Sequence, residues 1–548
     1  MKWKILSKKS KNIIETLLKN RGITTEKQKK EFFNPTDPMK ITLKSIGVKE
    51  SEIKKAIARI KEAREKGEHV IIYGDYDADG ISGTATMWEA LHEAGVFVLP
   101  HIPERFSEGY GLNIESVKRL KEKDPDLGLI ITVDHGITVG KKVKEVKDMG
   151  IDMIISDHHQ MGSIKPTPLA LIYTTEIGGS AVAWFFAREI LKALRVPASK
   201  FEIKERLELA AIGTIADQLP LKEANRSVVK YGLIELNGTR RPGLRALIEE
   251  ARIKDDIGTY EVGFMIAPRI NSMGRLKHGI ESLRLLCTNV PMKARQLAAD
   301  IGRTNFERQR IVDEVIIHAR KSYKDVEKQS VIILAHETYH EGVIGLAAAK
   351  LVEEFYRPAI VLSKKGDVSK ASARSIPGFN IIEAIRKLEG LYIEGGGHPM
   401  AAGFSIHTLK IEEFGKKLNK IAQESLTPEI LSKKLTIDVE VSFSDLTPAL
   451  YNELVRFEPT GLGNPGVNFL TKNVEILEIR AVGRDSKHLK LKLKHGEHIF
   501  DSIFFGGGEN YSTLTPGVKA DVVFRLQENT WNGRISLQLV IKDLRIYN

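Results

Sequence analysis

The chain has 548 residues, 42% hydrophobic and 28% charged, so it can bury several cores, and about 150 residues per domain predicts three or four domains. Its net charge of +12 is compatible with nucleic-acid binding but does not establish it, because residues 1–30 hold ten Lys or Arg and two Glu and so carry eight of these charges. No apolar run approaches the ~18 residues of a membrane helix, and the single Cys287 excludes an internal disulfide, so we expect a cytoplasmic protein without membrane contact.

The first predicted element is an amphipathic helix in the basic N-terminal segment. Ile13, Ile14, Leu17 and Leu18 form an apolar stripe among the lysines, which is typical of a helix with one solvated charged face. We interpret residues 1–45 as a basic N-terminal extension.

Strands and helices alternate in the next segment. After a predicted helix at 52–65, the apolar runs 70–73, 129–133 and 153–156 predict strands, with helices at 82–93 and 114–121. Unbroken apolar runs of this kind are typical of buried parallel strands. Residues 46–218 are therefore predicted to form a parallel-sheet α/β domain.

Acidic groups follow the first of these strands. Asp75, Asp77 and Asp79 stand at alternate positions, and carboxylates so close together repel unless a cation lies between them. Hard divalent ions such as Mg²⁺ or Mn²⁺ prefer these oxygen ligands. A calcium loop is an alternative, but its twelfth position should be Glu and is Thr86 here; a plain solvated acidic turn is the other.

The two later strands also end in potential metal ligands. Asp134 follows the second run, and Asp157, His158 and His159 follow the third. Open α/β sheets bind their ligands at the carboxyl ends of the strands, so these side chains should converge on one crevice. Together the three strand ends favour a metal site over a solvated turn.

Three further regions complete the predicted architecture. Residues 219–326 are a helical region that ends in a long linking helix at 292–323, and residues 327–430 are a second α/β domain that contains the glycine-rich segment at 395. Period-two alternation begins near Leu435, so residues 431–548 are predicted to form a small β-barrel, with Asn532-Gly533 as a hairpin turn.

Several motifs resemble the DHH phosphoesterase family, and the whole chain resembles its RecJ branch. They are the loop 75–80, Asp157-His158-His159, and the segments 213–217, 267–276, 340–345 and 395–403. The resemblance implies an α/β multidomain protein with a parallel-sheet DHH domain, a long linking helix, a DHH-associated domain and a C-terminal OB-fold β-barrel.

The resemblance also implies a two-metal site with two Mn²⁺ or Mg²⁺ ions. Its metal ligands would be Asp75, Asp77 and Asp134 for one ion, and Asp79, Asp134, His158 and Asp217 for the other. From spacing alone, a cap of the next segment is favoured over a metal ligand at Asp217. The implied catalytic residues are Asp134 as the bridging ligand, His159 on the scissile phosphate, and Asp157 as the group that orients the imidazoles.

A substrate pocket is implied by the same likeness. The residues at matching positions are Arg105, Arg275, Ser372, Arg374, Gly396, Gly397 and His398. Arginine suits a terminal phosphate because it donates bidentately, and glycines in a turn allow backbone amides to approach an anion. Asn271 and His340 are weaker candidates in this cleft. In the barrel, Phe500, Phe504, Phe505 and Trp531 are candidates for base stacking or for core packing.

The function implied is a metal-dependent 5′-to-3′ exonuclease acting on single-stranded DNA in repair and recombination. Its implied partners are a single strand with a 5′ end, single-strand-binding protein and a RecQ-type helicase, and it is expected to be a monomer. One alternative is a DHH phosphodiesterase for short oligonucleotides or cyclic dinucleotides, which the additional barrel disfavours. The other is an inactive Cdc45-like scaffold, which the complete ligand set disfavours.

Overall fold

The computed structural model describes residues 1–322, 329–531 and 533–547, with the side chains of Trp531 and Arg534 left out of the description. The chain divides into two compact units. The α/β unit comprises residues 42–217 and 232–433, and the barrel unit comprises residues 1–41, 218–231 and 434–548. In the described ranges, no helix is both long and apolar enough to cross a membrane.

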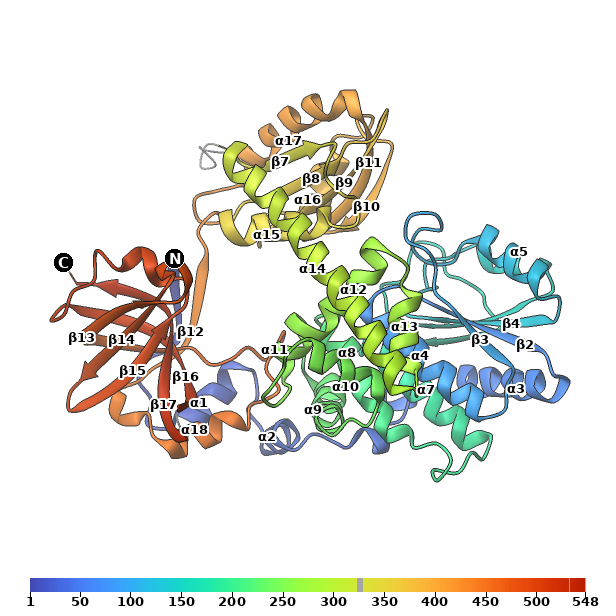
Figure 1. Cartoon of the computed structure of the whole chain (residues 1–548), viewed down its shortest axis with the longest axis horizontal. Coiled ribbons are helices and arrows are strands. Elements are labelled where there is room, and N and C mark those ends of the chain that lie inside the picture. Colours follow the sequence, from blue (N-terminus) through green and yellow to red (C-terminus); the bar gives the residue numbers. More distant parts are fainter. Residues whose placement is uncertain (323–328, 532, 548) are drawn as a thin grey trace. The chain divides into compact units, whose positions relative to one another are not determined.

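A five-stranded parallel sheet forms the first layer of the α/β unit, and its strand order is β3-β2-β4-β5-β6 (Figure 1). The strands are β2 (His69–Gly74), β3 (Val98–His101), β4 (Leu127–Val133), β5 (Asp152–Asp157) and β6 (Ala170–Tyr173). Most side chains of β2, β4 and β5 are buried, as their apolar runs predicted. All three carboxyl ends lie at one edge of the sheet because the strands are parallel.

Helices surround this sheet, and three of them stand between its successive strands in the sequence. They are α3 (Glu50–Lys66), α4 (Ala78–Glu93), α5 (Ile114–Lys123), α6 (Lys142–Asp148), α7 (Gly179–Ala193) and α8 (Leu207–Ala216). Helices α4, α7 and α8 pack on one another. Gly83 of α4 permits this contact, because a Cβ there would lie 3.1 Å from the Cα atom of Ser180.

The helical region that follows leads to the second sheet. Its elements are α9 (Glu223–Asn237), α10 (Pro242–Glu250), α11 (Thr259–Glu261), the π-helical turn η4 (Val262–Ile266), α12 (Ala267–Leu276), α13 (Ile280–Cys287) and α14 (Pro291–Ser322). The 32 residues of α14 match the predicted linking helix and span about 48 Å at 1.5 Å per residue. The predicted last residue, Tyr323, lies outside the described residues.

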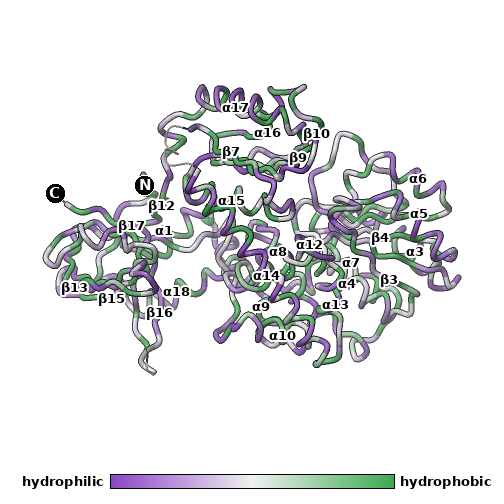
Figure 2. The backbone as a smooth tube through the Cα atoms, turned by 45° about the horizontal axis from the view of Figure 1, so that its top comes forward, coloured by the Kyte–Doolittle hydropathy of each residue, from purple (hydrophilic) through white to green (hydrophobic). Residues whose placement is uncertain are grey.

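The second sheet of the α/β unit has the strand order β10-β11-β9-β8-β7. Its elements are β7 (Ile332–His336), α15 (Ile344–Phe355), β8 (Ala359–Ser363), β9 (Val368–Arg374), α16 (Ile381–Arg386), β10 (Glu394–His398), β11 (Ala401–His407) and α17 (Ile411–Ser425). Helix α17 packs Phe414 and Leu418 into the core beneath it. Figure 2 shows the corresponding alternation of hydrophobic and hydrophilic residues along α17.

The glycine-rich segment differs from the expected phosphate-binding turn. Gly395, Gly396 and Gly397 form the exposed edge strand β10, which pairs with β11. A Cβ at Gly397 would lie 2.3 Å from the carbonyl oxygen of Ala401, and its φ of +150° also favours glycine. The glycines therefore allow close strand pairing, and one side of the strand remains at the sheet edge.

The barrel unit contains the predicted C-terminal barrel. Its elements are β1 (Lys2–Ser7), α1 (Ile13–Asn20), α2 (Glu26–Phe33), β12 (Lys434–Glu440), α18 (Pro448–Val455), β13 (Phe469–Val482), β14 (His488–His495), β15 (His498–Phe504), β16 (Lys519–Trp531) and β17 (Arg534–Ile546). Pairing of β13 with both β14 and β16 closes the barrel. The predicted hairpin joins β16 and β17, but Asn532 lies outside the described residues.

The N-terminal segment belongs to this same unit. Strand β1 pairs in parallel with β12, and Leu17 and Leu18 of α1 lie in the barrel core. The expected apolar stripe is therefore buried, although residues 1–45 were predicted as a separate extension. Among the base-stacking candidates, Phe500 and Phe504 pack against the core and Phe505 is exposed, whereas the side chain of Trp531 lies outside the description.

Candidate active site

The acidic loop after β2 packs tightly against the start of α4. Asp77 is the N-cap of this helix, and its carboxylate accepts hydrogen bonds from the backbone amides of Asp79 (3.0 Å) and Gly80 (3.1 Å). A Cβ at Gly80 would lie 2.6 Å from the Cβ of Asp75. Glycine at this position therefore lets the loop fold back and bring the carboxylates together.

A second helix N-terminus holds Asp79. Its two carboxylate oxygens accept hydrogen bonds from the backbone amides of Gly179 (2.8 Å) and Ser180 (3.0 Å) at the start of α7. A Cβ at Gly179 would lie 2.1 Å from Asp134 Oδ1, and one at Gly213 would lie 2.1 Å from Asp79 Oδ1. The buried acidic groups therefore need glycine on two neighbouring helices.

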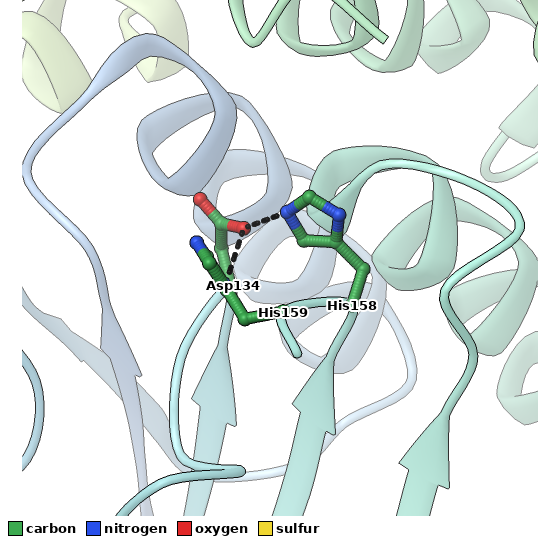
Figure 3. A group of neighbouring side chains, drawn as sticks. All are labelled: Asp134, His158 and His159. Atoms are coloured by element: carbon green, nitrogen blue, oxygen red, sulfur yellow. Dashed lines mark ion pairs between the residues drawn. The ribbon is translucent and has the colours of Figure 1, made fainter. Parts of the chain in front are cut away.

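Asp134 and His158 meet at the ends of β4 and β5, as Figure 3 shows. The His158 Nε2 atom lies 3.1 Å from Asp134 Oδ1, 3.7 Å from Asp79 Oδ2 and 3.6 Å from Asp217 Oδ2. Both His158 Nε2 and Asp134 Oδ1 are buried without a hydrogen bond of acceptable geometry. Orphaned ligand atoms that face one another in this way fit a bound cation.

Three overlapping groups at this edge of the sheet have ligand atoms within 4.8 Å of one another. They are Asp75, Asp77 and Asp134; Asp79, His158 and Asp217; and Asp134, His158 and His159. Their oxygen and imidazole atoms suit Mn²⁺ or Mg²⁺. The first two groups match the two ligand sets that the resemblance implied, except that Asp134 is not in the second group.

The electrostatics of the site favour bound positive charge. Burial first, and then neighbouring carboxylates, raise the pKa values of Asp75, Asp77 and Asp134. The same causes raise the pKa of Asp217 to about 8. Because a divalent cation would favour the ionised carboxylates, its binding would relieve this repulsion.

Mn²⁺ should therefore raise the melting temperature of the metal-free protein. A ligand that binds only the folded state stabilises it by about 2.7 kcal/mol at a hundred times its Kd. The shift should be largely lost in Asp77→Asn, as differential scanning calorimetry with and without Mn²⁺ can measure. Asp126→Asn is the matched control, because His69, Asp124 and Asp126 form another potential metal group. A shift lost only in that control would place the metal there instead.

Asp157 connects the third strand to His159 and does not face the proposed ions directly. Its Oδ1 accepts from His159 Nδ1 (2.8 Å) and from the backbone amide of His158 (2.7 Å), and its Oδ2 accepts from the Ile137 amide (2.8 Å). Burial lowers the pKa of His159, but the hydrogen bond and charge of Asp157 outweigh it and raise that pKa to about 9. The hydrogen bond from Asp157 therefore orients the ring and favours its protonated form.

A polar pocket of about 570 Å³ lies in the same unit. Its lining includes the predicted Arg105, Arg275, Ser372, Arg374 and Gly396, together with Lys370, Glu341 and Glu394, which were not predicted. The predicted Gly397 and His398 lie on β10 but are not among its lining residues. Three arginines and Lys370 outnumber the two glutamates, so the lining carries a net positive charge that favours an anion.

Burial and mutual repulsion of the guanidinium groups in the pocket lower the stability of the folded protein. Burial, and then the charges of Arg105 and Arg308, lower the pKa of Arg275 to about 10. Burial and Arg105 also lower the pKa of Arg374. A phosphate between these groups would favour their charged forms.

Two residues from other segments contact the acidic loop, and one of them, Arg105, also lines the pocket. Arg105 lies over the ring of Tyr76, 5.1 Å from its centroid, and Asn271 Oδ1 accepts from the Ala78 amide at 2.7 Å. Asn271 was only a weak candidate, and Tyr76 was not singled out. The only sequence signal for these two residues is their place inside the motifs at 75–80 and 267–276. Their contacts join segments that are far apart in the chain, so local sequence pattern does not predict them.

Models of three domain families match this chain. The DHH family N-terminal domain matches residues 69–214, the DHHA1 domain matches residues 328–424, and the RecJ OB domain matches residues 437–543. These matches confirm the predicted order of folds along the chain.

Similar proteins are named single-stranded-DNA-specific exonuclease RecJ. That of Bacillus subtilis is 35% identical over 97% of this chain and 68% of its own length, and that of Escherichia coli is 31% identical over 90% of each. A crystal structure of RecJ from Thermus thermophilus in complex with Mn²⁺ is also similar, with 29% sequence identity and a TM-score of 0.84. The match covers 99% of this chain and 79% of the Thermus thermophilus chain. A similar crystal structure of that protein holds Mg²⁺. The chain therefore belongs to the RecJ family of single-stranded-DNA-specific exonucleases.

Proposed function

We propose that this chain removes nucleotides from the 5′ end of single-stranded DNA, in DNA repair and recombination. The observation that carries the proposal is one α/β unit that contains two groups of side chains able to hold metal ions and a pocket with three arginines. The relatives' common specificity for single-stranded DNA supports the substrate. The barrel, which matches the RecJ OB domain, supports a polymeric strand over a dinucleotide.

The donor set of the site is suited to two divalent ions. Mn²⁺ or Mg²⁺, when bound, would activate water for attack and neutralise charge on the phosphoryl oxygens. We assign the metal ligands as Asp75, Asp77 and Asp134 for one ion and Asp79, Asp134, His158 and Asp217 for the other. Support comes from the grouping of these side chains and from the orphaned atoms of Asp134 and His158. Asp217 is 36% exposed, so its side of the site faces the solvent.

His159 is proposed to bind the scissile phosphate. The Nδ1 atom of His159 is hydrogen-bonded to Asp157, which leaves Nε2 as the atom that would contact substrate. Nε2 lies 3.4 Å from the Tyr110 hydroxyl. A protonated ring can donate to a non-bridging phosphate oxygen and stabilise its negative charge. The proposed mechanism needs no side chain as general base.

The arginine pocket is proposed to hold the terminal 5′ phosphate. Arg105, Arg275 and Arg374 would donate to its oxygens, with the Ser372 hydroxyl beside them. The backbone of β10 at Gly396, Gly397 and His398 would contact the strand at the sheet edge. A fixed terminal phosphate would place the next phosphodiester at the metal site and so give cleavage its direction.

Strand polarity gives the direct test. We expect wild-type protein with Mn²⁺ to release labelled mononucleotide from 5′-labelled single strands at once and from 3′-labelled strands only late. A blunt duplex should resist, because paired bases do not present a single-stranded end. Early release from the 3′ end would refute the proposed polarity, and equal cleavage of the duplex would refute the strand specificity.

The family resemblance also supports a proposal about protein partners, oligomeric state and cellular location. We propose single-strand-binding protein and a RecQ-type helicase as partners, a monomeric state and a cytoplasmic location. Sedimentation of the purified chain, alone and with each partner, measures the oligomeric state and the interactions.

A further inference from the structure

The loop that joins β3 to α5, residues 102–113, reaches both the arginine pocket and His159. Its Arg105 lines the pocket, and its Tyr110 hydroxyl lies 3.4 Å from His159 Nε2. The rings of Tyr110 and His159 also meet edge to face, with centroids 6.1 Å apart and an interplanar angle of 72°. The position of this one loop therefore determines where Arg105 stands and what lies beside His159.

The backbone of this loop has little intrinsic rigidity. Residues 102–113 are all described and form turns and bends without a helix or strand. Gly109 and Gly111 adopt left-handed φ values of +80° and +78°, and a Cβ at either position would meet open space. These glycines allow the chain to turn but add no side-chain packing, and glycine loses more conformational freedom on ordering than any other residue. The loop therefore needs an anchor to hold Arg105 in one place.

Glu108 supplies that anchor. Its Oε2 atom accepts a hydrogen bond from Ser116 Oγ of α5 at 2.5 Å and lies 3.2 Å from His101 Nε2 at the end of β3. Its backbone carbonyl accepts from Asn113 Nδ2 at 2.9 Å. The side chain is 11% exposed, so water competes little for these contacts. One carboxylate thereby joins the loop to the elements on both sides of it.

The anchor also lies close to Arg105 and to the strand that ends at the acidic loop. Glu108 stands three residues after Arg105, and its backbone amide donates to the Glu104 carbonyl at 2.9 Å, which closes a turn around Arg105. The hydroxyl of Tyr73, a fully buried residue of β2, lies 3.5 Å from Glu108 Oε2. Glu108 does not line the pocket itself, so any effect it has on a bound phosphate acts through Arg105.

We propose that Glu108 is a positioning residue that fixes the loop 102–113 and so keeps Arg105 in the arginine pocket. The proposal rests on the proposed function, since it assumes that Arg105 binds the terminal 5′ phosphate. Without the anchor, Arg105 occupies its binding position for only a fraction of the time, and the apparent affinity for the phosphate falls by that fraction. The proposed metal ligands stand outside this loop, so metal binding stays unchanged.

Strands that differ only at the 5′ end provide the kinetic test. In Glu108→Ala, KM for 5′-phosphorylated single strands should rise on the order of tenfold, because a buried hydrogen-bonded charged group is lost. Strands with a 5′ hydroxyl should keep nearly the wild-type KM. Glu108→Gln should restore most of the difference, because its amide oxygen can still accept from Ser116. Ser116→Ala should change KM in the same direction as Glu108→Ala.

The matched control for these variants is Glu115→Ala. Glu115 belongs to α5 next to Ser116, but it is 69% exposed and pairs with Lys118 at 2.7 Å. This control should leave KM unchanged for both kinds of strand. An equal change of KM on phosphorylated and hydroxyl strands in Glu108→Ala would overturn the proposal, because a general defect of the fold does not distinguish the two ends.

Measurements without cleavage provide an independent test. Hydrogen exchange followed by mass spectrometry should be faster across residues 102–113 in Glu108→Ala than in wild type, and unchanged in β4 and β5. Inorganic phosphate should raise the melting temperature of wild type more than that of Glu108→Ala, whereas Mn²⁺ should stabilise both equally. Unchanged exchange in the loop would overturn the proposal. If wild type cleaves neither strand, the proposed function fails, and exchange and phosphate stabilisation still decide whether Glu108 holds Arg105 in place.

Discussion

Asp134→Asn should abolish metal-dependent cleavage of single-stranded DNA while leaving the protein folded. Asp134 belongs to two of the potential metal groups and lies 3.1 Å from His158 Nε2, so its loss should disturb both proposed ions. Metal ions contribute several kcal/mol to the stabilisation of a phosphoryl transition state, which corresponds to a loss of roughly a thousandfold or more in kcat. Initial rates on 5′-labelled strands with Mn²⁺ measure this effect.

Asp134→Asn should lower activity but raise the stability of the metal-free protein. A stability measurement therefore distinguishes the loss of a metal ligand from damage to the fold. The raised pKa of Asp134 means that its ionised form opposes folding once the pH exceeds the pKa of an unfolded aspartate. A neutral Asn avoids this cost, and it tolerates the φ of +66° at this position. Metal-free Asp134→Asn should therefore melt above wild type at neutral pH. A lower melting temperature together with lost activity would contradict the ligand assignment.

The positions of Asp75 and Asp134 follow from local pattern. Unbroken apolar runs predict buried parallel strands, and parallel strands carry whatever follows them to one edge of the sheet. Asp217 could not be placed this way, because it follows helix α8 and reaches His158 only through the packing of α8 against α4 and α7. Its spacing alone therefore favoured a cap of the next segment over a metal ligand.

Long-range pairing explains other differences between expectation and structure. Strand β1 pairs with β12, more than 400 residues later, and no local pattern in the basic N-terminal segment indicates such a partner. Gly395–Gly397 form an edge strand because β11 follows directly and pairs with them.

Arg374→Gln should remove most of the preference for a 5′-phosphorylated end. Arg374 lines the pocket with Arg105 and Arg275, and its guanidinium donates to Ser372 Oγ at 3.2 Å and to the Ala373 carbonyl at 2.8 Å. A hydrogen bond to a charged group contributes about 1.5–3 kcal/mol, so kcat/KM for phosphorylated strands should fall roughly tenfold to a hundredfold. Strands with a 5′ hydroxyl should be cleaved at nearly the wild-type rate, because they never used this contact.

The comparison of the two strand ends makes the test specific to the pocket. Arg303→Gln is the matched control, because Arg303 is an exposed arginine of α14 that pairs with Asp300 and does not line the pocket. Burial and the charge of Arg105 lower the pKa of Arg374, so removing its charge should leave the melting temperature equal or higher. Inorganic phosphate should stabilise wild type more than Arg374→Gln. An equal loss on phosphorylated and hydroxyl strands would instead assign Arg374 to the chemical step or to the fold, because only a terminal-phosphate contact distinguishes the two ends.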